Sequence, residues 1–182
     1  MTDAGAQDSL RVAILCASDK GYRRLREDTA TPAIASLMRE DGYAVVSTIL
    51  LPDDRTMIAE ELTRLCDEQL ADLILTTGGT GLSPRDVTPE ATLDVVQRLV
   101  PGIPETMRAA GMLLTDRAML SRATAGIRGT TLIINLPGSP KGAVENLTAV
   151  LPALRHGLET LTGRISECAR HDHTNQTKRE VQ

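Results

Sequence analysis

The sequence predicts one α/β domain in three layers, with a mainly parallel sheet flanked by helices and one added β-hairpin. Short apolar runs that fit buried strands alternate along the chain with longer segments whose apolar residues recur at helical spacing. Crossovers through a helix place neighbouring strands parallel to each other. The length of 182 residues suits one domain with a sizeable core and is too short for two comfortable ones.

The chain begins with a polar leader, expected to be flexible over residues 1–10, and then enters its first strand. Val12–Ala17 is an apolar run typical of a strand buried on both faces. Ser18 and Asp19 follow and place a hydroxyl and a carboxylate at the carboxyl end of this strand. The segment Lys20–Asp28 is charged, so we expect a mobile loop there.

A helix and a second strand come next. Pro32 is expected to open the helix and Gly42 to close it. Tyr43–Leu51 is rich in Val and Ile and predicts a strand that ends at the acidic pair Asp53–Asp54. Capping of the following helix explains one of these two aspartates. The apolar positions that define the two helices are Ile34, Leu37 and Met38 in the first and Ile58, Leu62, Leu65 and Cys66 in the second.

The third strand leads into a loop rich in glycine. Leu73–Leu75 is continuously apolar, and glycines follow at positions 78, 79 and 81. We expect the next helix to have Thr88 as its N-cap and Pro89 as its first residue, with Glu90 near the positive end of the helix dipole. The buried stripe of this helix is expected to be Leu93, Val96 and Val100.

The last third of the chain predicts a helix, a hairpin and a long helical region. The first helix runs from Pro104 to about Leu114, with Met107 and Met112 as core residues. Two strand-like runs form the hairpin: the first leads to the glycine-containing pair Arg128–Gly129, and the second is Thr131–Ile134. Pro152 is expected to kink or split the final helix.

Beyond this helix the chain turns polar, so we divide it into a leader, a domain over residues 11–163 and a polar tail over residues 164–182. Cys168, His171 and His173 in the tail are expected to be solvated side chains rather than metal ligands. Cys16 and Cys66 are expected to be buried thiols, because the three cysteines lack the spacing of a zinc site or a disulfide framework.

Composition argues against several classes of protein. The net charge is -4, and the chain has two Tyr but neither Phe nor Trp. A nucleic-acid binder normally has a basic surface and aromatic side chains for stacking, so this class is disfavoured. The N-terminus lacks the pattern of a signal peptide, and no apolar run approaches membrane-spanning length, so we expect a cytoplasmic protein without a membrane partner.

The glycine-rich loop is the main functional signal. Glycines let backbone N–H groups surround an anion, and a helix start adds further donors, so the expected guest is a phosphate. Asp86 is unfavourable beside a bare phosphate and makes sense if Mg²⁺ lies between the two, which indicates a nucleotide. The loop lacks both the P-loop lysine and the GxGxxG order of a dinucleotide fold, so the nucleotide enzyme would be of another kind.

Polar residues follow each of the expected parallel strands. Ser18–Asp19, Asp53, the Gly78–Asp86 loop and Gly138–Lys141 all fall at strand ends. In parallel sheets ligands collect outside the carboxyl ends of the strands. We therefore expect these four loops to meet in one pocket.

The stretch TTGGTGLSPRDVTPEAT at 76–92, with LSR at 120–122 and NLPGSPK at 135–141, resembles the MogA/MoaB family of molybdenum-cofactor biosynthesis proteins, the molybdopterin adenylyltransferases. The likeness covers roughly Arg11 to Gly163. The related domain of CinA-type amidases usually reads TGGLGPT, and MoeA-type relatives are much longer.

The resemblance implies the transfer of AMP from Mg-ATP to the terminal phosphate of molybdopterin, with release of pyrophosphate. It implies that Asp53 and Asp86 are catalytic and hold Mg²⁺, and that Gly78, Gly79, Thr80 and Gly81 bind phosphate through backbone N–H groups. The other residues expected to bind nucleotide or molybdopterin are Ser18, Asp19, Ser121, Pro137, Gly138, Ser139 and Lys141. It also implies a homotrimer and hand-over of the product to a MoeA-type metal-insertion protein.

One departure from the family pattern affects a single loop. Many relatives read EDTSGPAI where this chain has Ala30–Thr31 in place of Ser-Gly. Two alternative functions stay open: a non-catalytic molybdopterin-binding or scaffold protein, and hydrolysis of a nicotinamide nucleotide. The basic cluster Arg23, Arg24 and Arg26 either draws an anionic substrate to the pocket or is a solvated loop.

Overall fold

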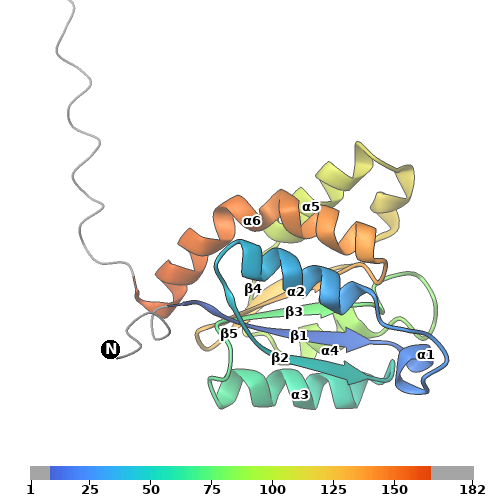
Figure 1. Ribbon diagram of the computed structural model, residues 1–182, viewed down its shortest axis with the longest axis horizontal. Coiled ribbons are helices and arrows are strands. Elements are labelled where there is room, and N and C mark those ends of the chain that lie inside the picture. The colour runs from blue at the N-terminus through green and yellow to red at the C-terminus, as the bar shows by residue number, and fades with distance from the viewer. Residues whose placement is uncertain (1–8, 165–182) are drawn as a thin grey trace, which may run out of the picture.

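In the computed structural model, which is described here for residues 9–164, the protein is a three-layer α/β domain (Figure 1). In chain order its elements are β1 (Arg11–Ala17), α1 (Asp19–Tyr22), α2 (Ala30–Glu40), β2 (Ala44–Leu51), α3 (Arg55–Asp67), β3 (Leu73–Thr77), α4 (Thr88–Val95), β4 (Arg98–Leu99), α5 (Gly102–Met112), the 3₁₀ helix η1 (Asp116–Leu120), β5 (Ala125–Arg128), β6 (Thr131–Leu136) and α6 (Pro140–Thr162).

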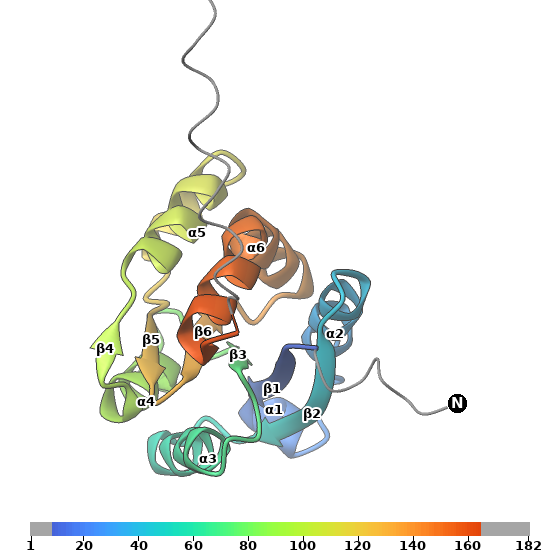
Figure 2. The same cartoon turned by 90° about the vertical axis from the view of Figure 1, so that its left-hand side faces the viewer.

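The six strands form one sheet in the order β2-β1-β3-β6-β5-β4. β2, β1, β3 and β6 are mutually parallel, whereas β5 and β4 run antiparallel to their neighbours. Figure 2, which looks along the strands, shows α2, α5 and α6 on one face and α3 and α4 on the other. The predicted mainly parallel sheet with an added hairpin is confirmed.

The strands are apolar along their whole length because both of their faces are covered. Val12 and Ile14 contribute to the core under α2 and α6, whereas Ala13 and Leu15, the alternate residues of β1, contribute to the core over α3 and α4. All four side chains are fully buried. This period of two within a continuous apolar run is what a doubly covered parallel strand requires.

The parallel arrangement brings four chain segments to one edge of the sheet. Cys16 lies in register with Thr77, and Thr77 with Leu136, so the residues that follow β1, β3 and β6 emerge side by side. β2 joins them, because Ala17 lies in register with Leu51. The expected convergence of the four loops is therefore present in the fold.

The helix after the glycine-rich loop differs from its prediction. Thr88 is the first helical residue rather than the N-cap, which is Val87. The helix ends at Val95, because Val96 is extended and leads into β4, which pairs with β5. Leu93 is about half exposed, and Val96 and Val100 lie outside the helix, so the predicted stripe was wrong. Pairing with β5 replaced a further helical turn.

The segment between β1 and β2 also differs from its prediction. Asp19–Tyr22 forms a short helix where a loop was expected, because the Ser18 hydroxyl accepts a hydrogen bond from the N–H of Gly21. α2 begins at Ala30, ahead of Pro32, because Asp28 Oδ1 accepts hydrogen bonds from the N–H groups of Ala30 and Thr31. Pro32 fits within that first turn, where its missing N–H is not needed.

Three smaller expectations concern α5, α6 and the domain boundaries. Met107 is buried as predicted, but Met112 is 41% exposed at the end of α5 and is not a core residue. α6 is not split at Pro152, since buried leucines on both sides of the proline hold it against the sheet. Leu10 is buried and belongs to the domain rather than to the leader.

The tail prediction is only partly within the described residues. Arg164 pairs with Asp72 (3.3 Å), so it is attached to the domain. Residues 165–182, with Cys168, His171 and His173, lie outside the described part. Cys16 and Cys66 are buried as expected.

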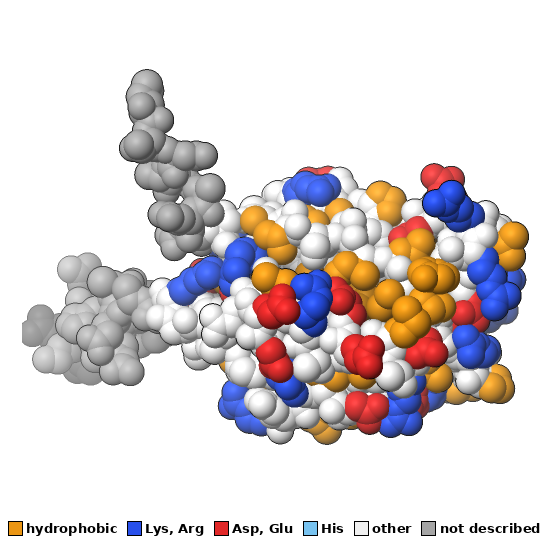
Figure 3. Space-filling model, turned by 90° about the horizontal axis from the view of Figure 1, so that it is seen from below, with side chains coloured by type: hydrophobic (Ala, Val, Ile, Leu, Met, Phe, Trp, Pro, Cys, Tyr) orange, Lys and Arg blue, Asp and Glu red, His pale blue; other side chains and the backbone are white. Residues whose placement is uncertain are grey.

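Charged side chains of both signs alternate on the face formed by α3 and α4 (Figure 3). Arg55 of α3 pairs with Asp94 of α4 (2.6 Å), and Arg128 pairs with Asp67 (2.8 Å). These contacts tie the two helices and the hairpin together at the surface. Among residues 9–164 no helix is long and apolar enough to cross a membrane.

Candidate active site

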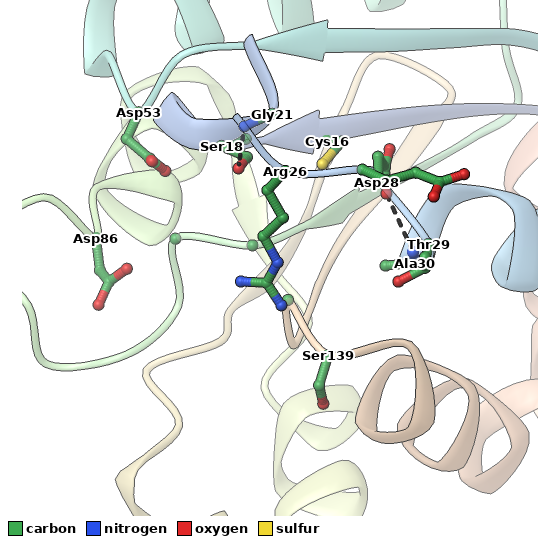
Figure 4. Close-up of a pocket in the computed structure, with 15 residues that line it drawn as sticks. Cys16, Ser18, Gly21, Arg26, Asp28, Thr29, Ala30, Asp53, Asp86 and Ser139 are labelled. Atoms are coloured by element: carbon green, nitrogen blue, oxygen red, sulfur yellow. Dashed lines mark hydrogen bonds between the residues drawn. The ribbon is translucent and has the colours of Figure 1, made fainter. Parts of the chain in front are cut away.

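A pocket of about 380 Å³ opens at the carboxyl edge of the parallel strands. We call it the first pocket; Figure 4 shows its lining residues. It collects residues from all four loops that follow β1, β2, β3 and β6. The predicted site residues that line it are Ser18, Asp53, Gly78, Gly79, Asp86, Gly138 and Ser139.

The loop after β3 consists of residues Gly78–Val87. Its first two glycines are needed because a side chain at either position would collide with neighbouring atoms. Gly78 has φ of +91°, and a Cβ there would lie 2.3 Å from the carbonyl oxygen of Ala17. Gly79 has φ of +63°, and its Cβ would lie 2.3 Å from Thr88 Oγ1 and 3.3 Å from Asp53 Oδ1. A side chain at 79 would therefore fill the space in front of Asp53. We call this segment the glycine loop.

The backbone N–H groups of the glycine loop are mostly unused within residues 9–164. Gly78 donates a long hydrogen bond to the carbonyl of Leu136 (3.3 Å). The N–H groups of Gly79, Thr80 and Gly81 have no protein acceptor among the described residues. Three successive amides are thus free to bind anionic oxygens, as the sequence predicted for this loop.

Asp53 and Asp19 hold the ends of β2 and β1 together. The N–H of Asp19 donates to Asp53 Oδ2 (2.8 Å), and the N–H of Asp53 donates to Asp19 Oδ1 (3.2 Å). Arg85 of the glycine loop adds a bidentate pair with the Asp19 carboxylate. Although desolvation opposes ionisation of Asp19, these contacts hold its pKa below the ordinary value. Asp19 thus positions Asp53 without lining the pocket.

The pKa of Asp53 is shifted in the opposite direction from that of Asp19. Partial burial raises its pKa, and the nearby negative charges of Asp19 and Asp86 raise it further. The hydrogen bond from the Asp19 backbone opposes this effect without cancelling it. The positive charge of Arg85 also lowers the pKa of Asp53, but it does not cancel the rise. Asp53 and Asp86 both line the first pocket and form a pair of carboxylates there.

Mg²⁺ fits this pair by donor chemistry. It prefers carboxylate oxygens and is commonly bound by one or two of them together with substrate phosphates. Gly79 leaves Asp53 open, and a Cβ at Gly81 would lie 2.9 Å from Asp86 Oδ2, so the absence of side chains keeps both acids accessible. No cluster of three or more metal-binding side chains exists among the described residues, so a complete protein cage is absent there.

Arg122 holds the glycine loop in shape and was not among the predicted site residues. Its guanidinium donates to the carbonyls of Gly81 (2.6 Å) and Asp86 and pairs with Glu90 at the start of α4. Its own N–H donates to the carbonyl of Thr80 (3.0 Å). Its position in the LSR motif was the available signal, but the loop it reaches is some forty residues away in sequence.

A second pocket of about 280 Å³ lies on the other side of the glycine loop. Ser139 lines both pockets, so the two cavities are neighbours at the start of α6. The predicted residues that line the second pocket are Thr80, Gly81, Ser121, Pro137 and Ser139. Thr115, Arg117 and Asn146 also line it and were not predicted.

Some residues have contacts different from those expected. Lys141 lies outside both pockets; its side chain is 86% exposed and approaches Glu145 at 3.8 Å. The hydroxyls of Ser18 and Ser139 accept hydrogen bonds from N–H groups at the starts of α1 and α6, which leaves the hydroxyl protons free to be donated to a ligand.

Burial, followed by the charge of Asp28, raises the pKa of Cys16 to about 12, so this pocket thiol stays protonated at neutral pH.

The segment before α2, residues Arg23–Thr29, closes one side of the first pocket. Arg26, Glu27, Asp28 and Thr29 line it, and none of them was among the predicted site residues. The charged composition of this segment was the available signal. The departure at Ala30–Thr31 lies directly after it, where Asp28 supplies the cap of α2. We call this segment the arginine loop.

Residues 13–156 match the family described as a probable molybdopterin binding domain. The chain is 40% identical over 161 residues to a molybdopterin adenylyltransferase of Helicobacter pylori, covering 87% of this chain and 92% of that protein. It is 38% identical to the molybdopterin adenylyltransferase of Escherichia coli K12, covering 80% of this chain and 76% of the relative. The crystal structure of the molybdopterin biosynthesis enzyme MoaB from Thermus thermophilus superposes with a TM-score of 0.80 and 52% identity, covering 85% and 97% of the two chains.

Proposed function

This chain belongs to the MogA/MoaB family of molybdopterin adenylyltransferases, and we propose that it transfers AMP from Mg-ATP to the terminal phosphate of molybdopterin across the wall between the two neighbouring pockets. The observation that carries the proposal is the shared wall. The glycine loop and Ser139 border both cavities, so two phosphate-bearing molecules in the two pockets would meet there.

The reaction joins two anions. An oxygen of the pterin phosphate attacks the α-phosphorus of ATP, and the bond from that phosphorus to the bridging oxygen breaks. The electron pair leaves with pyrophosphate. Such transfers depend on alignment of the reactants and on neutralisation of charge, which an enzyme supplies by preorganised donors.

Each part of the site has a role in this proposal. We assign the nucleotide to the first pocket and the pterin to the second. The free amides of Gly79, Thr80 and Gly81 hold phosphate oxygens between them. Asp53 and Asp86 would hold Mg²⁺, which when bound supplies positive charge to the phosphates. Asp19 and Arg122 position these groups through the contacts described above.

Assembly, hand-over and location are parts of the same proposal. We propose that the protein is a cytoplasmic homotrimer and passes the adenylylated product to a MoeA-type protein, as the family resemblance implies. Light scattering of the full chain gives the subunit number directly. A mass corresponding to one subunit at micromolar concentration would refute the trimer without touching the reaction.

The proposed reaction is tested by incubating the full chain with Mg-ATP and molybdopterin. We expect stoichiometric pyrophosphate and adenylylated pterin. Asp86→Asn is expected to lower kcat by about 100-fold or more while leaving the fold intact, because it removes a carboxylate that would hold Mg²⁺ beside the phosphates. Binding of molybdopterin without pyrophosphate release would instead identify a scaffold protein, and release of ammonia from a nicotinamide nucleotide would identify the CinA-type reaction.

A further inference from the structure

The first pocket contains one cation that is not engaged by the protein. Among the described residues that line this pocket, Arg26 is the only basic one. Its side chain takes part in no ion pair or hydrogen bond within residues 9–164. The arginines that do form ion pairs there are Arg11, Arg55, Arg64, Arg85, Arg122, Arg128 and Arg164. Arg85, the nearest comparable cation of the glycine loop, is held by Asp19.

The Arg26 side chain extends into the first pocket, so its unpaired guanidinium can reach a ligand bound there. In Figure 4 its guanidinium points away from the arginine loop, between the side of the pocket with Asp86 and the side with Ser139. The N–H groups of Gly138 and Ser139 have no protein acceptor among the described residues, and α6 begins directly after them. An anion on this side would meet backbone donors and one guanidinium.

Acids line the first pocket on both sides of Arg26 (Figure 4). Glu27 and Asp28 belong to the arginine loop, and Asp28 already accepts the N–H groups at the start of α2. Asp53 and Asp86 provide negative charge on one side, which suits a metal-bound face of a polyphosphate. The opposite face of the same polyphosphate carries oxygens that a metal at the two acids does not neutralise. A guanidinium binds such oxygens through paired N–H groups.

We propose that Arg26 is a catalytic residue that binds the phosphates of the nucleotide on the side opposite the two acids, and that it stabilises the charge that develops as pyrophosphate leaves. This inference rests on the proposed function, because it assigns the nucleotide to the first pocket. It explains why an exposed arginine is directed into a pocket that contains no other basic side chain among the described residues.

The test compares three variants of the full chain. Arg26→Gln removes the charge, and Arg26→Lys keeps the charge but loses the planar fork. Arg24→Gln is the matched control, because it makes the same charge change in the same loop at a residue that does not line the pocket. Both positions are exposed in the fold, so the unfolding midpoints of all three variants are expected to match the wild type.

We expect Arg26→Gln to lower kcat/KM for ATP by about 100-fold. Arg26→Lys should recover part of the loss, and Arg24→Gln should stay within about twofold. The apparent affinity for molybdopterin, measured without nucleotide, should be unchanged in all three. A second readout independent of turnover is calorimetric binding of Mg²⁺ with the α,β-methylene analogue of ATP, for which only the two Arg26 variants should show an increased Kd.

The outcomes separate this inference from the proposed function. An active wild type in which Arg26→Gln behaves like Arg24→Gln in both assays would overturn the role of Arg26 alone. A loss of molybdopterin affinity with unchanged analogue binding would also overturn it, because Arg26 would then contact the other substrate. A wild type that releases no pyrophosphate would refute the proposed function, while the calorimetric comparison would still test Arg26.

Discussion

Two aspartates at opposite ends of the same parallel sheet, Asp53 and Asp72, have carboxyl groups in opposite environments. Asp72 directly precedes β3, and its side chain is 7% exposed. The backbone N–H of Arg11 donates to it (2.8 Å), the Arg11 guanidinium pairs with it (2.9 Å), and Arg164 adds a second cation. Although burial opposes ionisation, these contacts lower the pKa of Asp72.

Asp53 follows β2 at the other edge and has much less support. One backbone N–H donates to its carboxylate, and its nearest charges include two further acids. Desolvation and these like charges raise its pKa. The comparison shows that an acid satisfied by the protein stabilises the fold, whereas an acid left short of positive charge is available to a ligand.

The largest expected effect is the loss of activity when Asp53, the aspartate assigned to the site, is replaced. Asp53→Asn should lower kcat by about 100-fold or more, because the remaining amide does not replace a carboxylate at a cation. The amide oxygen still accepts the Asp19 N–H, so the free energy of unfolding in metal-free buffer should change by less than about 1 kcal/mol. Urea unfolding and initial rates of pyrophosphate release measure the two quantities. A stability loss as large as the activity loss would mean that Asp53 is structural.

The next largest effect is a loss of stability when Asp72, the aspartate paired with Arg11, is replaced. Asp72→Asn should lower the free energy of unfolding by about 2 kcal/mol at neutral pH, because Arg11 loses its charged partner in a largely buried place. The kcat of the folded variant should stay within about twofold, since Asp72 lies at the far edge of the sheet from both pockets. The same two assays serve for both variants. A selective loss of activity in Asp72→Asn would contradict the division of roles.

The smallest expected effect is a pH dependence of the stability that Asp72 contributes. A carboxyl whose pKa is lowered by folding contributes stability at neutral pH, and this contribution is lost as pH falls below the ordinary value of 3.8. The difference in unfolding free energy between the wild type and Asp72→Asn should therefore shrink from pH 7 to pH 3. Urea titrations at both values measure it. A constant difference would show that Asp72 acts by packing rather than by charge.

Much of the fold was predictable because apolar period and strand length are local properties. The runs at Val12–Ala17 and Thr131–Ile134 became β1 and most of β6. The hairpin formed as predicted, but its turn is Gly129–Thr130, because Arg128 is the last residue of β5 and pairs with Thr131. The errors occurred where distant contacts decided the outcome. Val96 and Val100 fit a helical stripe by spacing, but pairing of Arg98–Leu99 with β5 ended the helix at Val95.

The residues of the candidate site also divide into those that local sequence predicted and those that distant contacts decided. The carboxyl ends of the parallel strands are fixed by chain order, so the sequence predicted that Ser18, Asp53, Gly78 and Ser139 would share a pocket. It offered the basic cluster Arg23, Arg24 and Arg26 only as one of two alternatives, and it missed the contacts of Arg122. Their contacts depend on how loops bend and on a guanidinium that bonds with carbonyls far away in sequence, which no local pattern encodes.

The sequence by itself determined the parallel sheet and the glycine loop, because these follow from apolar period and steric freedom, and its resemblance to a known family implied the roles of the two acids. The tertiary structure decided that Asp72 forms ion pairs whereas Asp53 forms none among residues 9–164, and that Arg26 lines the first pocket without an ion-pair partner there. These properties are sums of charges and donors contributed by separate elements, so they exist only after β1, β2, β3 and α6 have come together.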